Sequence, residues 1–504
     1  MVDRKKYCIN GEWIESKTGN YMPVTNSSTG ELLAEVPCCT KEEVESAIAS
    51  AQAAFPAWSQ TSISKRAQMM FKWRNILIEH LDELTLLCSK ELGKNLNEAR
   101  GDVLKAIEPT ELSCAISSLI EGDCAMQVTT NFDTATYRMP LGVCAGIVPM
   151  NFPAMIPWGW MVPLAIACGN TFVLKAASKT PLTAMRIMEL FYDEGGFPKG
   201  VVNLVTCSRH EADIFLTDPR VKAVTFVGTT SVGKEIYSIA SANGKRVQAQ
   251  CEAKNHALVL EDCDLESTTN AVINSTYGCA GMRCMALPVC VVQESIADKF
   301  VHLLKKKAEA MIVGCAYDPK TQLGPVVTAE HKQKVCNWIQ KGVEEGAELV
   351  LDGRNIVVPG FEKGFFVGPT ILDHVKPGMT VGDREIFGPV TLIKRVKDFD
   401  EGIKIMNENP FANGSVIFTQ SGYYARKFAF LTDGGMVGIN VGIPVPSAYF
   451  PFSGNKQSFF GDLHVLGKDG VRFFTRAKTV TTSWYDDTSK HKNLDTWEGS
   501  VERI

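Results

Sequence analysis

The chain has 504 residues, of which 45% are hydrophobic, and its formal net charge is −4. This length allows roughly three domains with large buried cores. The charge provides neither a basic stripe for nucleic acid nor a polybasic surface for anionic membranes, so small molecules are the expected partners.

The first predicted elements are helices. Thr40 and Glu43 form a capping-box pattern ahead of an apolar repeat of helical spacing. Helical periodicity also dominates residues 64–115. We therefore expect the amino-terminal part of the chain to be rich in helix.

The stretch from Leu141 to Cys168 carries no charge and is long enough to cross a bilayer, but its prolines exclude a membrane span. Each proline removes an intrahelical hydrogen bond, and lipid offers no replacement partner. The pattern predicts instead a buried strand at 143–148, a loop at 149–153 and a fully covered apolar helix at 154–168.

From Asn170 onward, short apolar runs alternate with amphipathic stretches. A second series of this kind runs from about His256 to Val441. The alternation predicts two α/β layers with parallel, doubly wound sheets. The predicted strands lie at 171–174, 201–205, 223–227, 257–260 and 287–292, and the predicted helices at 183–194 and 211–216.

The end of the chain has a different pattern. Residues from Thr475 to Trp484 alternate β-branched side chains and have no evident hairpin partner nearby. We expect this segment to pair with a distant strand or with another subunit. The residues from Asp486 onward are polar and are expected to fray.

The sixteen cysteines bear on the cellular environment. All of them lie at or before Cys336, and none forms a C-x-x-C pair. No secretory leader precedes Tyr7. We expect reduced thiols in the cytoplasm, and no metal site, because H-E-x-x-H is also missing.

Two distant segments carry the chemistry. Cys284 lies in a glycine-containing loop at 278–286, and Asn151 precedes Phe152 and Pro153 in the other segment. A thiolate attacks carbonyl carbons, and an asparagine amide can donate to the oxygen that becomes negative. Alone, a cysteine is more often a small buried hydrophobe and Asn151 a turn residue. Together the segments indicate covalent aldehyde chemistry.

Five motifs in order show that the chain resembles the aldehyde dehydrogenase superfamily from roughly Cys8 to Trp484. Three further segments resemble its CoA-acylating branch, the methylmalonate-semialdehyde dehydrogenases. The superfamily motifs are Pro149-Met150-Asn151-Phe152-Pro153, Phe226-Val227-Gly228-Thr229-x-x-x-Gly233, Gly281-x-x-Cys284, Glu385-Ile386-Phe387-Gly388-Pro389 and Pro451-Phe452-Ser453-Gly454. The branch segments are Ala253-Lys254-Asn255-His256, Arg283-Cys284-Met285-Ala286 and Phe450-Pro451-Phe452-Ser453-Gly454.

The resemblance implies two doubly wound α/β domains, one binding a dinucleotide and one catalytic, plus a small β arm for oligomerisation. We assign residues 1–125 and 145–255 to the cofactor-binding domain and residues 256–445 to the catalytic domain. Residues 126–144 and 446–504 are assigned to oligomerisation and bridging segments. A homo-oligomer, either dimer or tetramer, is expected.

The resemblance also implies a mechanism. Cys284 attacks the aldehyde, and Asn151 and the Cys284 backbone N–H hold the oxyanion of the thiohemiacetal. Oxidation then gives a thioester. Hydrolytic relatives carry a glutamate base where this chain has Gln250, which cannot accept a proton at neutral pH. We therefore expect release to coenzyme A as acyl-CoA. Because Glu252 lies two residues later, hydrolysis to the free acid stays an alternative.

The expected cofactor is NAD or NADP, although the chain lacks G-x-G-x-x-G. Gly228 and Gly233 flank a strand-to-helix turn that could hold the pyrophosphate at a helix amino terminus; the alternative is an ordinary tight turn. The resemblance assigns Lys175 to the adenine ribose and Glu385 to the nicotinamide ribose. The remaining residues with expected cofactor contacts are Phe152, Thr229 and Phe387.

Cofactor selectivity is predicted from a departure from NAD-selective relatives. Many of these carry a glutamate three residues after the lysine, where this chain has Ser178, followed by Lys179. Removing an anion and adding a cation should make NADP acceptable.

Two cations are expected to bind the substrate. Members of the branch hold the substrate carboxylate with two arginines; Arg283 matches the first, and Lys105 stands at the second position. The Lys105 ammonium is a point charge rather than a planar guanidinium, but the site would still prefer an anionic substrate. Malonate or methylmalonate semialdehyde is the leading substrate, and succinate semialdehyde or a sulfonated aldehyde fits the same charges. Lys105 could otherwise lie on a solvated helix face.

Overall fold

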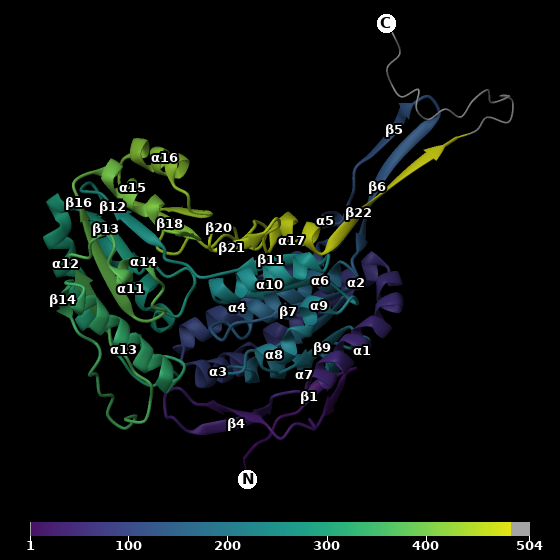
Figure 1. The fold of residues 1–504 in the computed structure, drawn as a ribbon, viewed down its shortest axis with the longest axis horizontal. Coiled ribbons are helices and arrows are strands. Elements are labelled where there is room, and N and C mark those ends of the chain that lie inside the picture. Colours follow the sequence, from purple (N-terminus) through teal and green to yellow (C-terminus); the bar gives the residue numbers. More distant parts are fainter. Residues whose placement is uncertain (1, 485–504) are drawn as a thin grey trace, which may run out of the picture.

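Two α/β bodies and a projecting β arm make up the computed structural model, which describes residues 2–484 (Figure 1). Each body is built around one mostly parallel sheet. The amino terminus and the arm lie at opposite ends of the molecule. The predicted α/β class with doubly wound sheets is confirmed.

The larger sheet has eight strands. Its five central strands are parallel, and antiparallel strands close both edges. The strands predicted at 143–148, 171–174, 201–205 and 223–227 are confirmed as β7 to β10. In spatial order the strands are β2 (Glu12–Ile14), β1 (Tyr7–Ile9), β9 (Val202–Val205), β8 (Thr171–Lys175), β7 (Val143–Ile147), β10 (Val221–Val227), β11 (Arg246–Gln250) and β21 (Phe459–Gly461).

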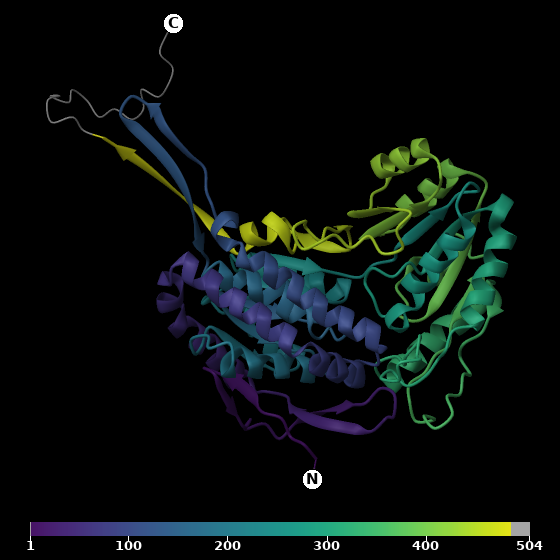
Figure 2. The ribbon, with the colours of Figure 1, turned by 180° about the vertical axis from the view of Figure 1, so that it is seen from behind.

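Helices cover the larger sheet, and Figure 2 shows the purple and blue ones in front of it. The Thr40 capping box is present: its hydroxyl accepts from the Glu43 N–H, and the Glu43 carboxylate accepts from the Thr40 N–H. The helix predicted at 211–216 is divided into two short ones. The helices are α1 (Lys41–Gln60), α2 (Ile63–Glu79), α3 (Leu81–Leu92), α4 (Leu96–Cys114), α5 (Ile116–Leu119), α6 (Val162–Ala167), α7 (Leu182–Asp193), α8 (Arg209–Ala212), α9 (Ile214–Thr217) and α10 (Thr230–Ala242).

The amino-terminal prediction was incomplete. The helix-rich region begins only after four strands, of which β3 (Tyr21–Thr25) and β4 (Leu32–Pro37) form a hairpin. The first strand pairs with β9 through Cys8 and Leu204. Because this pairing joins residues nearly 200 positions apart, no local pattern could indicate it.

The smaller sheet has seven strands, of which six are parallel and β14 is antiparallel at one edge. Its order is β14 (Glu348–Leu351), β15 (Thr370–Asp373), β16 (Val390–Val396), β13 (Val289–Gln293), β12 (His256–Val259), β18 (Gly414–Phe418) and β19 (Met436–Ile439). The surrounding helices are α11 (Leu265–Tyr277), α12 (Glu294–Glu309), α13 (Ala329–Glu344), α14 (Thr380–Asp383), α15 (Phe399–Glu408) and α16 (Gly422–Leu431).

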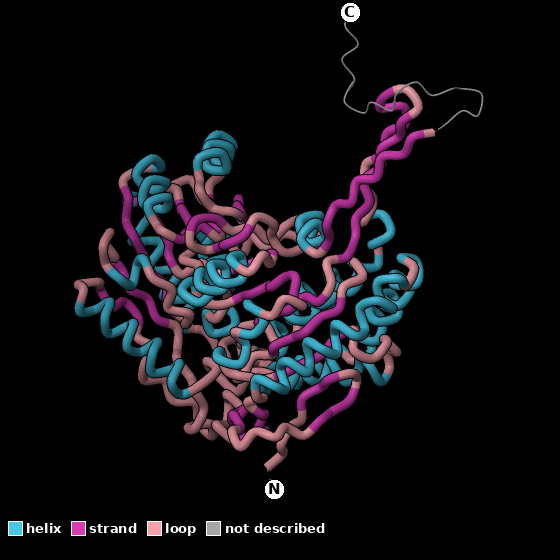
Figure 3. Tube along the Cα trace, turned by 45° about the vertical axis from the view of Figure 1, so that its right-hand side comes forward, coloured by secondary structure: helices cyan, strands magenta, loops and turns pink. Residues whose placement is uncertain are grey.

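The arm is a three-stranded antiparallel sheet that leaves the larger body (Figure 3). It consists of β5 (Cys124–Thr129), β6 (Phe132–Pro140) and β22 (Thr475–Ser483), with β6 in the centre. The prediction that the tail from Thr475 pairs with a distant strand is confirmed. Between β19 and the arm, the chain forms β20 (Asn455–Lys456), which pairs with the earlier strand β17 (Phe411–Ala412), and α17 (Gly467–Phe473). The prediction for residues from Asp486 lies outside the described residues.

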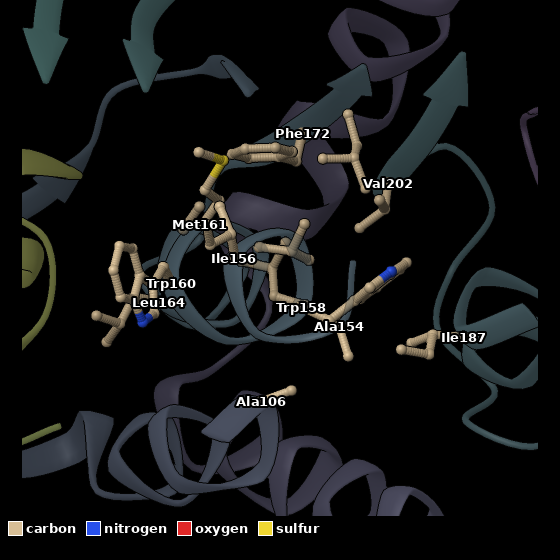
Figure 4. Packing of buried hydrophobic residues seen from close by; sticks show 14 of the residues in the cluster. Ala106, Ala154, Ile156, Trp158, Trp160, Met161, Leu164, Phe172, Ile187 and Val202 are labelled. Carbon is tan, nitrogen blue, oxygen red and sulfur yellow. The ribbon is translucent and has the colours of Figure 1, made fainter. Parts of the chain in front are cut away.

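The uncharged segment at 154–168 is buried throughout. It begins as a π-helical turn at Ile156–Met161 and continues as α6. Figure 4 shows Trp158 and Trp160 packed among apolar side chains, with Ala106 of α4 on one side and Phe172 of β8 on the other. Neither proline in it has an N–H to donate, which fits its irregular start. Among the described residues, no helix is both long enough and apolar enough to cross a membrane.

Candidate active site

The Cys284 loop depends on unusual backbone conformations. It follows α11, and Cys279, Ala280 and Gly281 all have left-handed φ values, of 51°, 51° and 73°. Such conformations cost non-glycine residues on the order of 1 kcal/mol or more each. A Cβ on Gly281 would lie 2.0 Å from the carbonyl oxygen of Gly388. Only glycine therefore lets the loop pack against the strand-connecting segment at 387–389.

Asn255 anchors the same loop. Its side-chain Nδ2 donates to the carbonyl oxygens of Cys284 and Ala286, each at 2.8 Å, and its Oδ1 accepts from the Gly414 N–H at 2.8 Å. Asn255 is buried. One amide thus ties the nucleophile segment to β18. Asn255 belongs to a motif quoted for the resemblance, but the sequence alone gave no reason to assign it this contact.

Asn151 reaches Cys284 from the other body. It follows β7 and is buried, and its Nδ2 donates to the Met282 carbonyl oxygen at 3.0 Å. A primary amide carries two N–H groups, so this bond leaves one for another acceptor. The amide is therefore held beside the nucleophile loop and keeps one N–H group available to donate.

Six of the predicted site residues share one cavity of about 260 Å³. They are Asn151, Gly228, Thr229, Cys284, Glu385 and Phe387. Three charged or titratable residues that the sequence did not single out for this pocket, or placed there only as an alternative, also line it: Glu252, His331 and Lys334. His331 has its Nε2 2.7 Å from the Phe387 carbonyl oxygen, which helps to fix that segment.

The cavity favours neutral forms of its titratable groups. Burial and, next, the charge of Glu385 raise the pKa of Cys284 to about 12, while backbone N–H groups and Lys94 oppose this rise. Burial and the neighbouring Glu252 raise the pKa of Glu385 to about 8. At neutral pH both groups are therefore mainly protonated, and the thiol must lose its proton as it attacks.

The turn between β10 and α10 leads into a helix amino terminus, although the Gly228 N–H already donates to the Gln250 carbonyl oxygen. The Thr230 N–H at the start of α10 already holds an anion, since it donates to the Glu252 carboxylate at 2.9 Å. Gly233 allows α10 to pack closely against Cys251, because a Cβ there would lie 2.3 Å from the Cys251 sulfur. The residues at this turn fit a dinucleotide phosphate, provided that Glu252 gives up its bond.

A second cavity, of about 170 Å³, lies further along α10 and contains Lys175. Arg209 also lines it and forms an ion pair with Glu235. The sequence missed Arg209, since one arginine at the start of a short helix carries no recognisable pattern. Ser178 and Lys179 do not line this cavity. The pKa of Glu330 at the start of α13 is lowered first by its own backbone N–H and by the Thr328 hydroxyl, and then by the charge of Lys179.

The two predicted substrate cations do not meet in one cavity. Arg283 contacts Cys279 Sγ at 3.1 Å and Glu98 at 3.4 Å, and it lines a separate cavity of about 930 Å³ beside α11. Lys105 is 46% exposed and pairs with Glu108 at 2.5 Å. Each cation is therefore paired with a glutamate of α4.

Phe152, Gln250 and Glu252 lie close to the site in different ways. The Phe152 ring faces the Lys94 ammonium, with Nζ 3.5 Å from the ring centroid, and Phe152 is not among the residues that line the Cys284 cavity. Gln250 is buried at the end of β11, where its amide donates to the Phe452 carbonyl oxygen at 3.3 Å. Glu252 lines the Cys284 cavity, whereas Gln250 does not.

All sixteen cysteines are free thiols and lie in the part of the chain that the structure describes. Within that part, no group of His, Cys, Asp and Glu side chains is suited to hold a metal ion.

Comparison with known proteins gives a consistent result. The model of the aldehyde dehydrogenase family matches residues 13–480. Malonate-semialdehyde dehydrogenase 1 of Oceanobacillus iheyensis is 45% identical over 477 residues, which cover 95% of this chain and 98% of that protein.

Two solved structures extend this likeness. An NAD complex described as a methylmalonate-semialdehyde dehydrogenase of Sinorhizobium meliloti has a TM-score of 0.95 and 38% identity, covering 97% of this chain and 99% of that one. Methylmalonate-semialdehyde dehydrogenase of Oceanimonas doudoroffii has a TM-score of 0.94 and 41% identity, covering 96% and 99%.

Proposed function

The chain belongs to the aldehyde dehydrogenase family, and we propose that it oxidises malonate or methylmalonate semialdehyde with NAD or NADP and releases the product as acyl-CoA. The observation that carries this proposal is the meeting of Cys284 and Asn151 in one cavity with a helix amino terminus. The identity to malonate-semialdehyde dehydrogenases supports the substrate class.

Cys284 is the proposed nucleophile. Its sulfur forms a bond to the aldehyde carbon and gives up its proton, and the carbonyl oxygen becomes an oxyanion. Asn151 has a free N–H to donate to that oxygen, and the backbone N–H of Cys284 is the second donor proposed. One such donor contributes about 10²–10³ in kcat in related acyl-transfer enzymes.

Several residues are proposed to hold the nicotinamide dinucleotide. The α10 amino terminus with Gly228 and Thr229 would bind the pyrophosphate, Lys175 the adenine ribose, and Glu385 with Phe387 the nicotinamide end. When bound, the nicotinamide accepts the hydride that leaves the thiohemiacetal carbon. The chain's own contribution is to orient that carbon: Asn255 fixes the loop that carries Cys284.

Release of the thioester to coenzyme A is supported by Gln250. At this position hydrolytic relatives have a glutamate base, whereas the buried Gln250 amide here donates to the Phe452 carbonyl oxygen. An amide cannot take a proton from water, but coenzyme A brings its own thiol nucleophile. One observation favours hydrolysis as a second candidate: the Glu252 carboxylate lines the cavity of Cys284. Its bond to Thr230 places it at the cofactor end.

Arg283 and Lys105 are proposed to select anionic aldehydes. Arg283 precedes the nucleophile directly, and Lys105 lies on α4, whose other end supplies Glu98 to Arg283. A substrate carboxylate would have to compete with Glu98 and Glu108 for these cations. Only an anionic substrate can replace a glutamate in such an ion pair, so either cation would favour an anionic over a neutral aldehyde.

We also propose a cytoplasmic homo-oligomer, either a dimer or a tetramer. The free thiols support a reducing compartment. The projecting arm supports oligomerisation, because an extended three-stranded sheet with exposed Met126, Tyr137 and Trp484 gains burial from a second copy. The proposed division into a cofactor-binding domain, a catalytic domain and oligomerisation segments follows the two sheets and the arm.

The test is a panel of aldehydes assayed with NAD and with NADP, each with and without coenzyme A. Malonate semialdehyde, methylmalonate semialdehyde, succinate semialdehyde and propanal cover the alternatives in charge and length. We expect acyl-CoA from the first two aldehydes only when coenzyme A is present. Free acid formed at the same rate without coenzyme A would replace this proposal with a hydrolytic enzyme.

A further inference from the structure

A buried ion pair lies directly beneath the Asn151 loop. The Lys94 ammonium and the Asp102 carboxylate are 2.9 Å apart, and both side chains are fully buried. Lys94 follows the end of α3, and Asp102 is in the second turn of α4. Burying two charges costs several kcal/mol of desolvation per ion, and apolar residues often stabilise such a place equally well. The pair therefore needs an explanation other than stability.

Its contacts point to the loop that carries Asn151. The Asp102 Oδ1 atom accepts from the Met155 N–H at 2.7 Å, and Oδ2 accepts from Lys94 and from the Cys88 thiol. The Lys94 ammonium lies 3.5 Å from the centroid of the Phe152 ring. Thus Lys94 contacts Phe152, and Asp102 contacts the backbone of Met155. Both contacts fall on the loop that carries Asn151.

We propose that Lys94 and Asp102 are positioning residues, which hold the Asn151 loop against the Cys284 loop. This inference rests on the proposed role of Cys284 and Asn151. Asp102 holds the loop by its backbone, and Lys94 holds it by the Phe152 ring, whose negative face attracts a cation.

The electrostatics of the surroundings agree with this role. Burial lowers the pKa of Lys94, but Asp102 and then Cys279 and Cys88 outweigh it, so the pKa is raised and the side chain stays cationic. Burial and Glu385 raise the pKa of Cys284, and backbone N–H groups and, after them, Lys94 oppose this rise. Arg283 also interacts with the charge of Cys284, so Lys94 shares this influence with a second cation.

The experiment compares the rate at which iodoacetamide alkylates Cys284 in the full-length protein, without substrate or cofactor, at one fixed alkaline pH. Peptide mass spectrometry follows Cys284, with the partly exposed Cys336 in the same sample as an internal reference. For Lys94→Met we expect a changed rate of Cys284 alkylation, because the Asn151 loop that packs against the Cys284 loop would shift, and an unchanged rate at Cys336. We also expect a loss in kcat that exceeds any change in KM.

Glu91→Gln is the matched control. Glu91 is also buried and also accepts backbone N–H groups, those of Leu182 and Thr183, but it does not touch the Asn151 loop. We expect a lower thermal midpoint with unchanged alkylation of Cys284. If Lys94→Met does not fold, Asp102→Asn keeps the shape of the pair and should lower kcat by losing the anionic anchor at Met155.

Two results would overturn the inference. One is a folded Lys94→Met protein with wild-type alkylation and kcat. The other is an equal slowing of alkylation in Glu91→Gln, which would make the effect merely structural. Because alkylation needs neither aldehyde nor coenzyme A, its outcome stays readable even if the proposed acyl transfer fails.

Discussion

The two loops that meet at Cys284 are supported in different ways. The Asn151 loop is held by buried charges, through Asp102 and Lys94. The Cys284 loop is held by backbone geometry, with left-handed residues at 279–281 and the Asn255 amide as a clamp. Substitutions that change a charge should therefore disturb the Asn151 loop most. Substitutions that add a side-chain atom should disturb the Cys284 loop most.

The largest expected effect is loss of the nucleophile. Cys284→Ala should abolish dehydrogenase turnover in a folded protein, because Cys284 is the thiol on the loop that Asn151 contacts, whereas Cys251, which also lines the cavity, follows β11. Cys279→Ala, in the same loop, is the control; it removes only a thiol that contacts Arg283, and it should keep most of the turnover. Steady production of NAD(P)H by the Cys284 variant would contradict the mechanism.

Removal of the oxyanion donor should come next. Asn151→Ala is expected to lower kcat by about 10²–10³, measured under saturating aldehyde and cofactor. Asn151→Asp keeps the shape but replaces the donor by an anion, so it should be no better than alanine. An aspartate variant with nearly normal kcat would show that turnover needs no N–H donation from this side chain, neither to the oxyanion nor to the Met282 carbonyl oxygen.

The backbone of the Cys284 loop can be tested with two glycines of similar φ. Gly281 has φ of 73° and a backbone oxygen in the way of a Cβ, whereas Gly244 has φ of 69° and open space. Gly244→Ala should cost about 1–2 kcal/mol, the penalty of the left-handed conformation alone. Gly281→Ala should cost roughly 1–3 kcal/mol more, as overpacked sites do. Equal thermal midpoints for the two variants would mean that the Cys284 loop can shift away from Gly388 without a cost in stability.

A sequence pattern could predict β7 to β10 of the larger sheet and β12 and β13 of the smaller one, because parallel strands buried on both faces are continuous apolar runs. It could not predict β1, whose partner is Leu204, nor the pairing of β22 with β6. Both depend on contacts between distant parts of the chain. The alternation at 475–484 predicted a strand, but not which one it would meet.

The site shows the same limit. Cys284, Asn151 and Glu385 belong to motifs, and the structure brings them into one cavity. Lys94, Asp102 and Arg209 could not be found in the same way, since their importance lies in what they touch. Arg283 and Lys105 were recognised as cations, but their pairing with Glu98 and Glu108 is a property of α4 packing.

Substrate charge should matter less than the nucleophile or the oxyanion donor. Arg283→Leu is expected to remove a charge-assisted contact of about 2 kcal/mol, seen as a loss in kcat/KM for malonate semialdehyde. Propanal, which has no carboxylate, should lose little and serves as the internal control. An equal loss for both aldehydes would mean that Arg283 supports the loop through Cys279 rather than binding substrate.

The smallest expected effect concerns cofactor choice. Ser178→Glu should weaken NADP binding by roughly tenfold and NAD binding less, because a carboxylate would repel a 2′-phosphate. Arg209→Gln is a useful comparison, since Arg209 lines the Lys175 cavity and Ser178 does not. Both variants are measured by fluorescence titration of the reduced cofactors. If the preference between NAD and NADP changes only in Arg209→Gln, then Arg209, and not Ser178, determines cofactor choice.

The central claim is that coenzyme A, and not water, releases the acyl group from Cys284. Rapid mixing of the enzyme with malonate semialdehyde and oxidised cofactor should give one burst of reduced cofactor per active site, followed by very slow turnover. Addition of coenzyme A should then start steady turnover, because Gln250 cannot activate water. Steady turnover without coenzyme A, abolished by Glu252→Gln, would contradict the claim and identify Glu252 as a hydrolytic base.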